Sequence, residues 1–240
     1  MSAAPPPDDV LRALAATWPA AATRRAGPFL LHEGRGGGRR VSAAQAQGPW
    51  VPADVEAAIA GMEALGQAPL FRLAPQEKAL AARLAGRGLV PAEVVLALAA
   101  PLPLGPVAGA GAVTAHWPPL PAQRALWEAG GTGVARQRVM ARVAGPRAAL
   151  ALGDAGVAFV ACAGNVAAVH ALLVAPARRR EGIGRRLMAG AALWAGQQGA
   201  GALAVAVVAT NAAALVLHSG LGLRECARWQ YHLLPGDADA

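Results

Sequence analysis

The chain has 240 residues, which allow one large domain or two small ones, and 55% hydrophobic residues are ample for a buried core. The formal net charge is +8, but Lys78 is the only lysine, the arginines are scattered and aromatic residues make up only 4%. Because no basic stripe with interleaved aromatic residues is present, we do not expect the chain to bind nucleic acid.

The chain begins without the positively charged and apolar regions of a signal peptide, since residues 5–9 read PPPDD. We therefore expect a cytoplasmic protein. Residues 187–223 carry no charge, and residues 200–217 are apolar enough to suggest a membrane helix. Glycines and polar residues divide this stretch, however, and its pattern favours a helix, a buried strand and a second helix. We expect no membrane contact.

The first hundred residues are predicted to alternate strands and helices. The first ten residues read as a loosely attached tail, and a short helix follows at residues 10–16. The spacing then predicts strands at 29–31, 70–73 and 94–98, a further strand after the loop of residues 32–44, and helices at 52–65 and 75–85.

A run of three glycines, Gly36–Gly38, lies between Arg35 and Arg39–Arg40. This composition fits either a phosphate-binding loop or a glycine-rich hairpin turn. No helix signal follows directly, and this favours the turn.

Residues 101–112, PLPLGPVAGAGA, have the proline and glycine content of a linker. We therefore predict an N-terminal half at residues 1–100, a linker at 101–112 and a C-terminal half at 113–240. The C-terminal half is predicted to contain a strand near residues 113–117, helices at 120–128 and 134–143, and strands at 148–152, 157–163 and 166–174.

The most informative stretch is VAPARRREGIGRRL at residues 174–187, which runs from an apolar strand through an arginine and glycine turn into a helix. Arg179, Gly182 and Gly184 form the pattern RxxGxG. Glycines let backbone amides approach a phosphate, and the following helix presents its positive N-terminal end. The stretch therefore predicts a site for a nucleotide-like anion.

A helix at 184–199, a strand at 203–208 and the segment NAAALVLHSGLGL at 211–223 follow this loop. Their order and spacing resemble the GNAT superfamily of N-acetyltransferases. The family's V-x-P-x-x-R-x-x-G-x-G element corresponds to Val174, Pro176, Arg179, Gly182 and Gly184, and its NxxAxxLYxxxGF element to Asn211, Ala214, Leu217, His218, Gly222 and Leu223. His218 replaces the family's tyrosine, and Leu223 replaces its phenylalanine. The resemblance covers roughly residues 113–234.

This resemblance implies an α/β (α+β) fold with a mixed, mostly antiparallel twisted sheet, a splayed parallel strand pair and flanking helices, which is the acyl-CoA N-acyltransferase fold. The element order of residues 1–100 and the stretch FLLHEGRGGGRRVSA also look like a degenerate copy that lacks the RxxGxG loop. We therefore expect two such halves, as in tandem members of the superfamily, of which residues 113–240 are the catalytic one.

The activity that the resemblance implies is transfer of an acetyl group from acetyl-CoA, the cosubstrate, to a primary amine by direct attack in a ternary complex. The alternative is a non-catalytic acyl-CoA-binding or sensor module. A dinucleotide-dependent oxidoreductase is disfavoured, because residues 203–208 contain no acidic ribose-binding residue. By the same resemblance, acetyl-CoA would be bound by Leu172, Leu173, Val174, Arg179, Arg180, Glu181, Gly182, Ile183, Gly184, Arg185 and Asn211.

The family often uses a glutamate as base, but an ungapped count backward from Arg179 reaches Ala168. His170 lies two residues further on the same strand face, where it is either the base or a hydrogen-bonded strand residue. His218 either protonates the leaving thiolate as an imidazolium or packs as a helix-end histidine. Tyr231 on the last strand is a backup acid or a core aromatic residue, and Asn211 is a CoA contact, a helix N-cap or both.

No metal site is expected, because Cys162 and Cys226 have neither CxxC spacing nor a nearby histidine pair. The expected partners are acetyl-CoA and an amine acceptor that the sequence does not identify, and the chain is expected to be a monomer or a homodimer.

Overall fold

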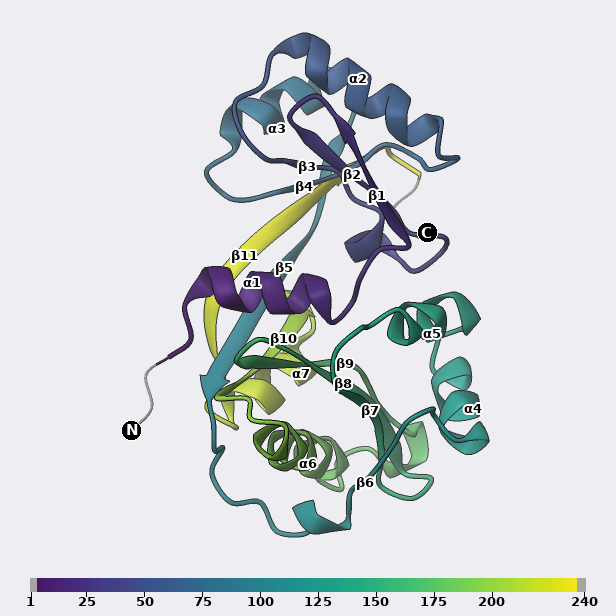
Figure 1. Ribbon diagram of the computed structural model, residues 1–240, viewed down its shortest axis with the longest axis vertical. Coiled ribbons are helices and arrows are strands. Elements are labelled where there is room, and N and C mark those ends of the chain that lie inside the picture. The colour runs from purple at the N-terminus through teal and green to yellow at the C-terminus, as the bar shows by residue number, and fades with distance from the viewer. Residues whose placement is uncertain (1–3, 237–240) are drawn as a thin grey trace. The chain divides into compact units, whose positions relative to one another are not determined.

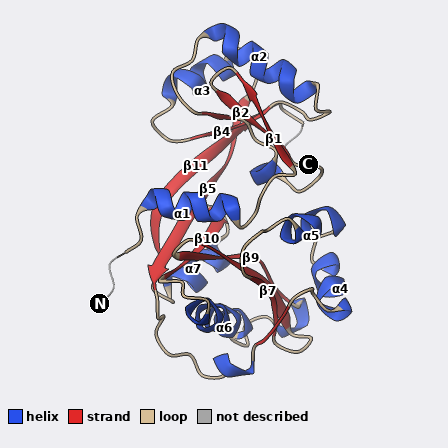
Figure 2. Ribbon diagram, in the orientation of Figure 1, coloured by secondary structure: helices blue, strands red, loops and turns tan. Residues whose placement is uncertain are grey.

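The computed structural model describes residues 4–236 and has a mixed α/β fold whose sheet is mostly antiparallel, which confirms the predicted fold class (Figures 1 and 2). The chain divides into two compact units. Of the described residues, unit 1 comprises 4–19, 96–207 and 211–227, and unit 2 comprises 20–95, 208–210 and 228–236. The sequence-based division at residues 101–112 stays a prediction.

Unit 1 contains a sheet in the strand order β11-β5-β10-β9-β8-β7-β6. The strands are β5 (Val90–Pro101), β6 (Thr114–His116), β7 (Arg147–Ala151), β8 (Gly156–Ala163), β9 (Val166–Val174), β10 (Ala202–Val208) and β11 (Arg224–Leu233). Strands β5 and β11 contribute residues to both units. Strands β6 to β9 pair in antiparallel fashion, whereas β9 pairs with β10 in parallel, because α6 (Ile183–Gln197) crosses over between them.

Helices cover both faces of this sheet (Figure 1). Helix α6 packs on β7, β8 and β9 through an apolar face that includes Leu187, Met188 and Ala191. Helices α1 (Pro7–Ala16) and α4 (Pro121–Ala129) contact β8 and β9, and α5 (Val134–Ala141) and α7 (Ala212–Ser219) complete the unit. The sheet therefore has α6 on one face and α1 with α4 on the other.

Helix α1 corrects the prediction of a tail over the first ten residues, because it begins at Pro7. Proline suits the first turn of a helix, and Asp8 and Asp9 there complement the positive end of the helix dipole. Val10, Ala13 and Leu14 are buried. The amphipathic pattern thus starts within the predicted tail.

The proline- and glycine-rich segment after β5 packs against the core of unit 1. Leu102, Leu104, Val107 and Val113 lie on the same apolar cluster as α6. Val113 lies so close to Gly190 of α6 that a Cβ on this glycine would lie 2.6 Å from the Val113 Cβ. The segment is therefore a packed crossing over α6.

Unit 2 contains the antiparallel sheet β1-β2-β3 and the pairing of β4 with β11. Its elements are β1 (Ala22–Ala26), β2 (Phe29–Glu33), β3 (Gln45–Ala46), α2 (Pro52–Glu63), β4 (Leu70–Leu73) and α3 (Lys78–Ala85). The rings of Phe29 and Phe71 meet edge to face with centroids 5.8 Å apart. Ala44 forms a parallel bridge with Phe71, so α2 crosses between two parallel segments.

Several element bounds in unit 2 differ from the prediction. Strand β1 was not predicted, because its sequence ATRRA is mostly exposed and has no apolar alternation. The strand forms by pairing with β2 across a turn at Gly27, whose φ is +55°. Helix α3 begins at Lys78 rather than at residue 75, and the Glu77 side chain accepts a hydrogen bond from the Ala74 amide at 2.6 Å. Strand β5 extends beyond the predicted residues 94–98.

The triple-glycine loop of unit 2 folds back on itself. The Gly37 amide donates to the Gly34 carbonyl at 3.1 Å, and a single 3-10 turn follows at Arg39–Val41. Arg35 pairs with Glu33, and Arg39 pairs with Glu93. These contacts favour the turn interpretation over the phosphate loop.

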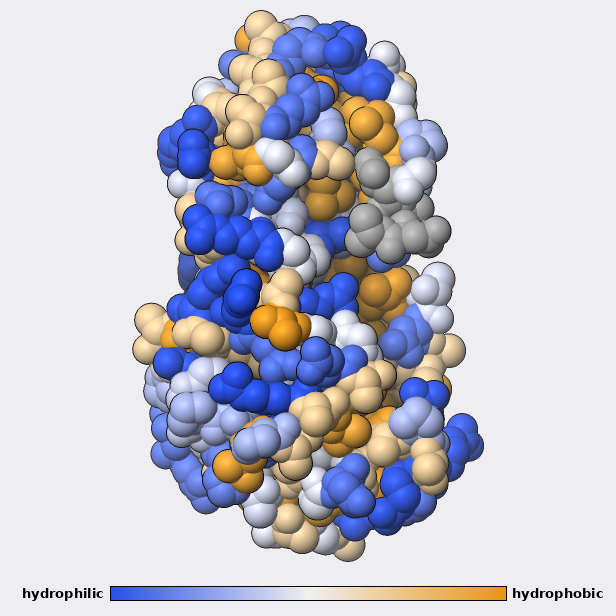
Figure 3. Space-filling view, turned by 90° about the vertical axis from the view of Figure 1, so that its right-hand side faces the viewer, coloured by the Kyte–Doolittle hydropathy of each residue, from blue (hydrophilic) through white to orange (hydrophobic). Residues whose placement is uncertain are grey.

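Among the described residues, no helix has the length and apolar character needed to cross a membrane. Hydrophilic and hydrophobic residues are interspersed on the face that Figure 3 draws. The large exposed apolar side chains, such as Leu193 and Val216, belong to different elements, as is usual for protein surfaces.

Two glycines of α6 provide a matched test of this packing. We expect Gly190→Ala to lower the free energy of unfolding by about 1–3 kcal/mol, because the added methyl group overlaps Val113. Gly196→Ala, in the same helix with no atom within 4 Å of the new Cβ, should raise it by up to about 1 kcal/mol through helix propensity. Urea denaturation measures both, and equal effects would contradict the packing of residue 113 on α6.

Candidate functional site

The loop after β9 leads directly into α6 and presents the start of this helix. A 3-10 turn, Pro176–Arg178, is followed by Arg180 and Gly182, whose φ angles are +71° and +72°. The first intrahelical bond runs from the Arg186 amide to the Gly182 carbonyl at 3.0 Å. The amides of residues 183–185 therefore have no carbonyl acceptor within the helix, and they lie at its positive end. This geometry suits an anion.

Part of the positive charge of this loop is not neutralised by ion pairs. Glu181, the only carboxylate in residues 174–187, forms an ion pair with Arg178 at 2.9 Å. The hydrogen bond in this pair lowers the pKa of Glu181 and raises that of Arg178. Within the described chain, Arg179 and Arg180 make no side-chain hydrogen bond or ion pair, so both guanidinium groups are available to a phosphate.

Gly184 brings the two sequence motifs into contact. A Cβ on this glycine would lie 3.1 Å from Leu217 Cδ2 of α7, and 3.8 Å from side-chain atoms of both Leu172 and Val174 of β9. A larger residue would separate the start of α6 from these neighbours. The glycine therefore allows α6, α7 and β9 to meet at one point.

Strand β9 contains a bulge immediately after His170. Phe159 pairs with His170 and Val157 pairs with Leu173, so two residues of β9 oppose one residue of β8. Ala171 has a φ of +48°, which is rare for a residue other than glycine. Its carbonyl accepts a hydrogen bond from Trp127 Nε1 at 2.8 Å, and Trp127 is fully buried. The sequence did not identify this role of Trp127, because it depends on contact with a residue 44 positions away.

The parallel pairing of β9 with β10 ends just before the bulge. Their register joins residues 166–169 to residues 202–205, whereas Leu173 and Val174 pair only with β8 in the described register. Residues 171–174 are partly exposed. The β10 side of this part of β9 thus offers backbone groups to an extended ligand, in the manner of strand addition.

His170 lies on the face of the sheet that α1 covers. Its side chain is 5% exposed, and its Nε2 lies 2.8 Å from Thr17 Oγ1. The Trp18 ring centroid is 5.2 Å away, and the Phe159 ring is stacked at 6.2 Å. His170 is therefore a hydrogen-bonded strand residue, and its role as base stays a prediction.

His218 and Asn211 lie at the two ends of α7. His218 is 6% exposed, and burial lowers its pKa to about 4, so its ring is neutral near pH 7. Its Nδ1 is buried and finds no hydrogen-bond partner among residues 4–236. This burial opposes the predicted role as an imidazolium acid. Asn211 Oδ1 accepts a hydrogen bond from the Ala214 amide at 3.1 Å, so Asn211 is an N-cap, and its contact with CoA stays a prediction.

Tyr231 lies in unit 2, whereas the loop and both histidines belong to unit 1. It is 3% exposed and faces Arg72 across the β11–β4 pair. Burial raises the pKa of its phenol, although Arg40 and Arg72 lower it. Its role as a backup acid stays a prediction.

Cys162 and Cys226 are free thiols, and burial raises the pKa of both. The described residues contain no group of three His, Cys, Asp or Glu side chains placed to hold a metal ion.

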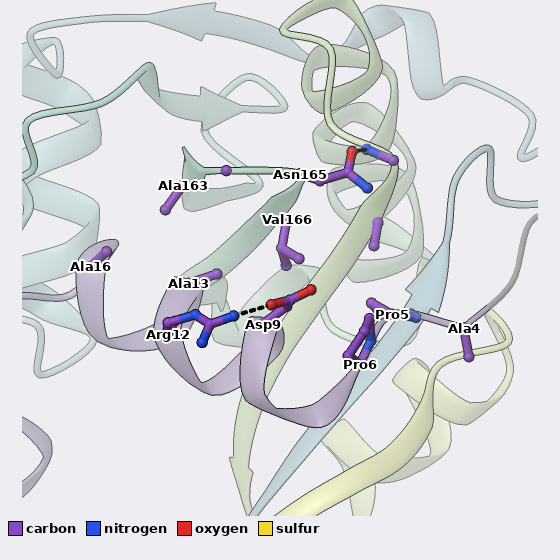
Figure 4. A pocket seen from close by; sticks show the side chains of 13 residues that line it. Ala4, Pro5, Pro6, Asp9, Arg12, Ala13, Ala16, Ala163, Asn165 and Val166 are labelled. Atoms are coloured by element: carbon purple, nitrogen blue, oxygen red, sulfur yellow. Dashed lines mark hydrogen bonds and ion pairs between the residues drawn. The ribbon is translucent and has the colours of Figure 1, made fainter.

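A cavity of about 620 Å³ lies at the opposite strand ends (Figure 4). Residues of α1, the β8–β9 turn and the start of β10 line it, and Asp9 and Arg12, its charged residues, form an ion pair. The loop that precedes α6 follows the other end of β9. This cavity is therefore distinct from the anion-binding loop.

Residues 127–223 match the model of the Acetyltransferase (GNAT) family. The match includes the loop before α6, β9, β10 and α7. No curated protein matches the chain.

Solved structures share the fold. A GCN5-related N-acetyltransferase from Kribbella flavida aligns with a TM-score of 0.64 at 20% identity, over 95% of this chain and 92% of its own. A GNAT-family protein from Novosphingobium aromaticivorans aligns with a TM-score of 0.55 at 19% identity, over 95% of both chains. A tandem GNAT protein from the clavulanic acid biosynthesis pathway gives 0.55 at 16% identity, over 96% of this chain and 88% of its own. At these identities the likeness shows the fold.

The neutral state of His218 predicts a specific loss of stability in acid. Because burial lowers the folded-state pKa from 6.5 to about 4, its contribution is present above pH 6.5 and is lost as the pH falls toward 4. Between pH 7.5 and 5, the wild type should lose about 2 kcal/mol of unfolding free energy relative to His218→Phe, which does not titrate. Urea unfolding at both pH values measures this difference. Replacement of the exposed His116 by Phe is the control, and parallel curves for wild type and His218→Phe would contradict the burial of this ring.

Proposed function

This chain belongs to the GNAT superfamily of acetyltransferases, and from this premise we propose that it transfers an acetyl group from acetyl-CoA to a primary amine. The observation that carries the proposal is the loop before α6, which directly follows the open end of β9 and combines the helix amides of residues 183–185 with the unpaired guanidinium groups of Arg179 and Arg180. Phosphates and an extended pantetheine arm need these two features side by side.

The backbone geometry of the loop suits the phosphates of CoA. Gly182 adopts a left-handed conformation, and a Cβ there would project into open space, so no neighbouring atom blocks the approach of a ligand to the helix start. Main-chain amides of residues 180–185 would hold the pyrophosphate, and Arg179 and Arg180 would add charge. Leu172, Leu173 and Val174 would hydrogen-bond the pantetheine arm and polarise the thioester carbonyl.

In the proposed reaction the amine nitrogen attacks the thioester carbon, a C–N bond forms, and the C–S bond breaks. One proton leaves the nitrogen, and one proton ends on the sulfur, so the products are an amide and CoA. His170 would accept the proton of the amine directly or through water. His218 is neutral near pH 7, so it would stabilise the departing thiolate as a hydrogen-bond donor rather than as an imidazolium acid.

We also propose that unit 2 is a degenerate half that has lost its phosphate site. Both units contain an antiparallel strand pair, then a helix that crosses over to a parallel segment: β2, β3 and α2 in one, and β8, β9 and α6 in the other. Helix α2, however, begins with Pro52, which has no amide hydrogen, and the Asp54 carboxylate accepts from the Val51 amide at 2.8 Å. A carboxylate at this position would repel a phosphate.

The acetyl group, the amine, the cytoplasmic location and the monomeric or dimeric state remain proposals from the sequence. Thiol release from mixtures of acetyl-CoA with amines of several classes, including amino acids, polyamines, aminoglycosides and peptide N-termini, tests the activity. Turnover above the rate without protein supports the enzyme. Binding of acetyl-CoA without turnover for any amine would instead support the acyl-CoA sensor.

Two glycines at opposite ends of α6 test the phosphate site. Gly182 and Gly199 both have positive φ angles and open space at the Cβ position, so the strain of a substitution is similar. We expect Gly182→Glu to weaken CoA binding at least about tenfold, because the carboxylate enters the anion site. Gly199→Glu should leave the affinity within about twofold. Calorimetric titration with CoA measures both, and equal affinities would refute the assignment of this loop.

A further inference from the structure

The peptide between Ala171 and Leu172 lies in the bulge of β9 and is held by a side chain of α4. Trp127 Nε1 donates a hydrogen bond to the Ala171 carbonyl oxygen at 2.8 Å, and Trp127 is fully buried. The register pairs neither Ala171 nor Leu172 with a residue of β8 or β10. The indole therefore gives this peptide a fixed contact from outside the sheet.

The direction of the Ala171 carbonyl sets the direction of the next amide. The peptide bond between Ala171 and Leu172 is trans. In a planar trans peptide the carbonyl oxygen and the amide hydrogen point in opposite directions. Because the carbonyl oxygen is directed at the indole of α4, the Leu172 amide hydrogen points away from α4.

The side of β9 that faces away from α4 is the side on which α6 begins. Helices α4 and α6 cover opposite faces of the sheet (Figure 1). The Leu172 side chain packs against the apolar cluster of α6, and its Cδ2 lies 3.8 Å from the Cβ position of Gly184. Pairing with β10 has already ended at Val169, and residues 171–174 are partly exposed. The Leu172 amide thus lies where β9 opens, close to the start of α6.

We infer that Trp127 is a positioning residue of the acyl transfer, which holds the Ala171 carbonyl and so aims the Leu172 amide at the carbonyl oxygen of the thioester. This inference rests on the proposed function. As the amine nitrogen forms the C–N bond, negative charge develops on that oxygen, and the Leu172 N–H stabilises the charge as a hydrogen-bond donor. The carbon–oxygen double bond is restored when the C–S bond breaks. Neither Trp127 nor Leu172 gains or loses a proton in this step.

The bulge needs such a contact because its conformation is strained. Ala171 has a φ of +48°, and a residue other than glycine keeps this conformation only when its surroundings hold it. A donor to developing charge is effective only when its direction is fixed in advance. Close packing of α4 on β9 supports the indole, since a Cβ on Gly130, at the end of α4, would lie 2.3 Å from Leu173 Cδ2. Loss of the indole donor would let the peptide rotate and turn the Leu172 amide away.

The first measurement is the infrared carbonyl band of carbon-13-labelled acetyl-CoA bound to the protein without an amine. A hydrogen bond to the thioester oxygen lowers this frequency, so we expect a lower frequency in the complex than in water. Benzothienylalanine at position 127 replaces the indole N–H by sulfur and keeps the ring shape, and it should move the band back toward that of free acetyl-CoA. Trp127→Phe removes the same donor and should move the band in the same direction.

A second tryptophan of unit 1 provides the matched control. Trp194 of α6 packs on the apolar cluster, and its indole nitrogen makes no hydrogen bond to any described residue. Benzothienylalanine at position 194 is therefore the same chemical change without loss of a hydrogen bond. It should leave the carbonyl band as it is in the wild type.

The second measurement is turnover of the same variants. Benzothienylalanine at position 127 should lower kcat about tenfold and leave the KM for acetyl-CoA within about twofold, because the lost interaction is stronger in the transition state than in the bound substrate. The variant at position 194 should change neither value. Calorimetric affinity for CoA, which has no acyl carbonyl, should stay within about twofold in all variants. Thermal unfolding of each variant identifies any loss of folded protein.

The outcomes separate this inference from the proposed function. A carbonyl band in the wild type at the frequency of free acetyl-CoA, or a lowered band that survives both changes at position 127, overturns it. A shifted band with an unchanged kcat also overturns the positioning role. If the wild type acetylates no amine, the proposed function fails, while a carbonyl band that depends on the Trp127 N–H still supports the inference. A wild type that binds no acetyl-CoA refutes both.

Discussion

The arrangement of unit 1 depends on the point at which β9 leaves β10. The two strands pair over only four residues each, and the bulge at Ala171 then turns β9 away. A bulge that holds a non-glycine residue at positive φ needs compensation, and Trp127 provides it through a buried hydrogen bond to the Ala171 carbonyl. Without this divergence, β9 and β10 would pair to their ends, and the backbone of residues 172–174 would have no open side. The bulge thus links helix α4, through Trp127, to the strand that carries the proposed chemistry.

Helices α6 and α2, the crossover helices of the two units, begin in different ways. Helix α6 follows Gly182, which has a left-handed conformation, and its first turn contains the closely packed Gly184. The nearby carboxylate of Glu181 pairs with Arg178. In α2 the corresponding turn contains a proline and an aspartate that caps the backbone. Both choices stabilise a helix start, but the first turn of α2 has one amide hydrogen fewer, because of Pro52, and it holds a carboxylate.

The two buried histidines of unit 1, His170 and His218, differ in their hydrogen bonding. The His170 ring has a hydrogen-bond partner, because its Nε2 lies 2.8 Å from Oγ1 of Thr17, the residue that follows α1. His218 has an unsatisfied Nδ1 and a pKa lowered to about 4, so it stays neutral at the pH where an imidazolium acid would be needed. A histidine in place of the family's tyrosine is therefore not an acid of similar strength, and the thiolate needs either a hydrogen-bond donor or a proton from elsewhere.

The sequence by itself determined the local features: the strand, glycine loop and helix of residues 166–197, the parallel crossover to β10 and the helix capped by Asn211. These follow from short-range patterns of apolar residues, glycines and caps, which neighbouring residues enforce. The tertiary structure alone decided what depends on residues far apart in the chain. The sequence did not predict β1, because its arginines are exposed and the strand forms by pairing with β2. The environment of His170 depends on Thr17, 153 residues earlier, and that of Ala171 on Trp127. Burial of His218 likewise arises from packing, and packing sets the protonation state that no sequence pattern specifies.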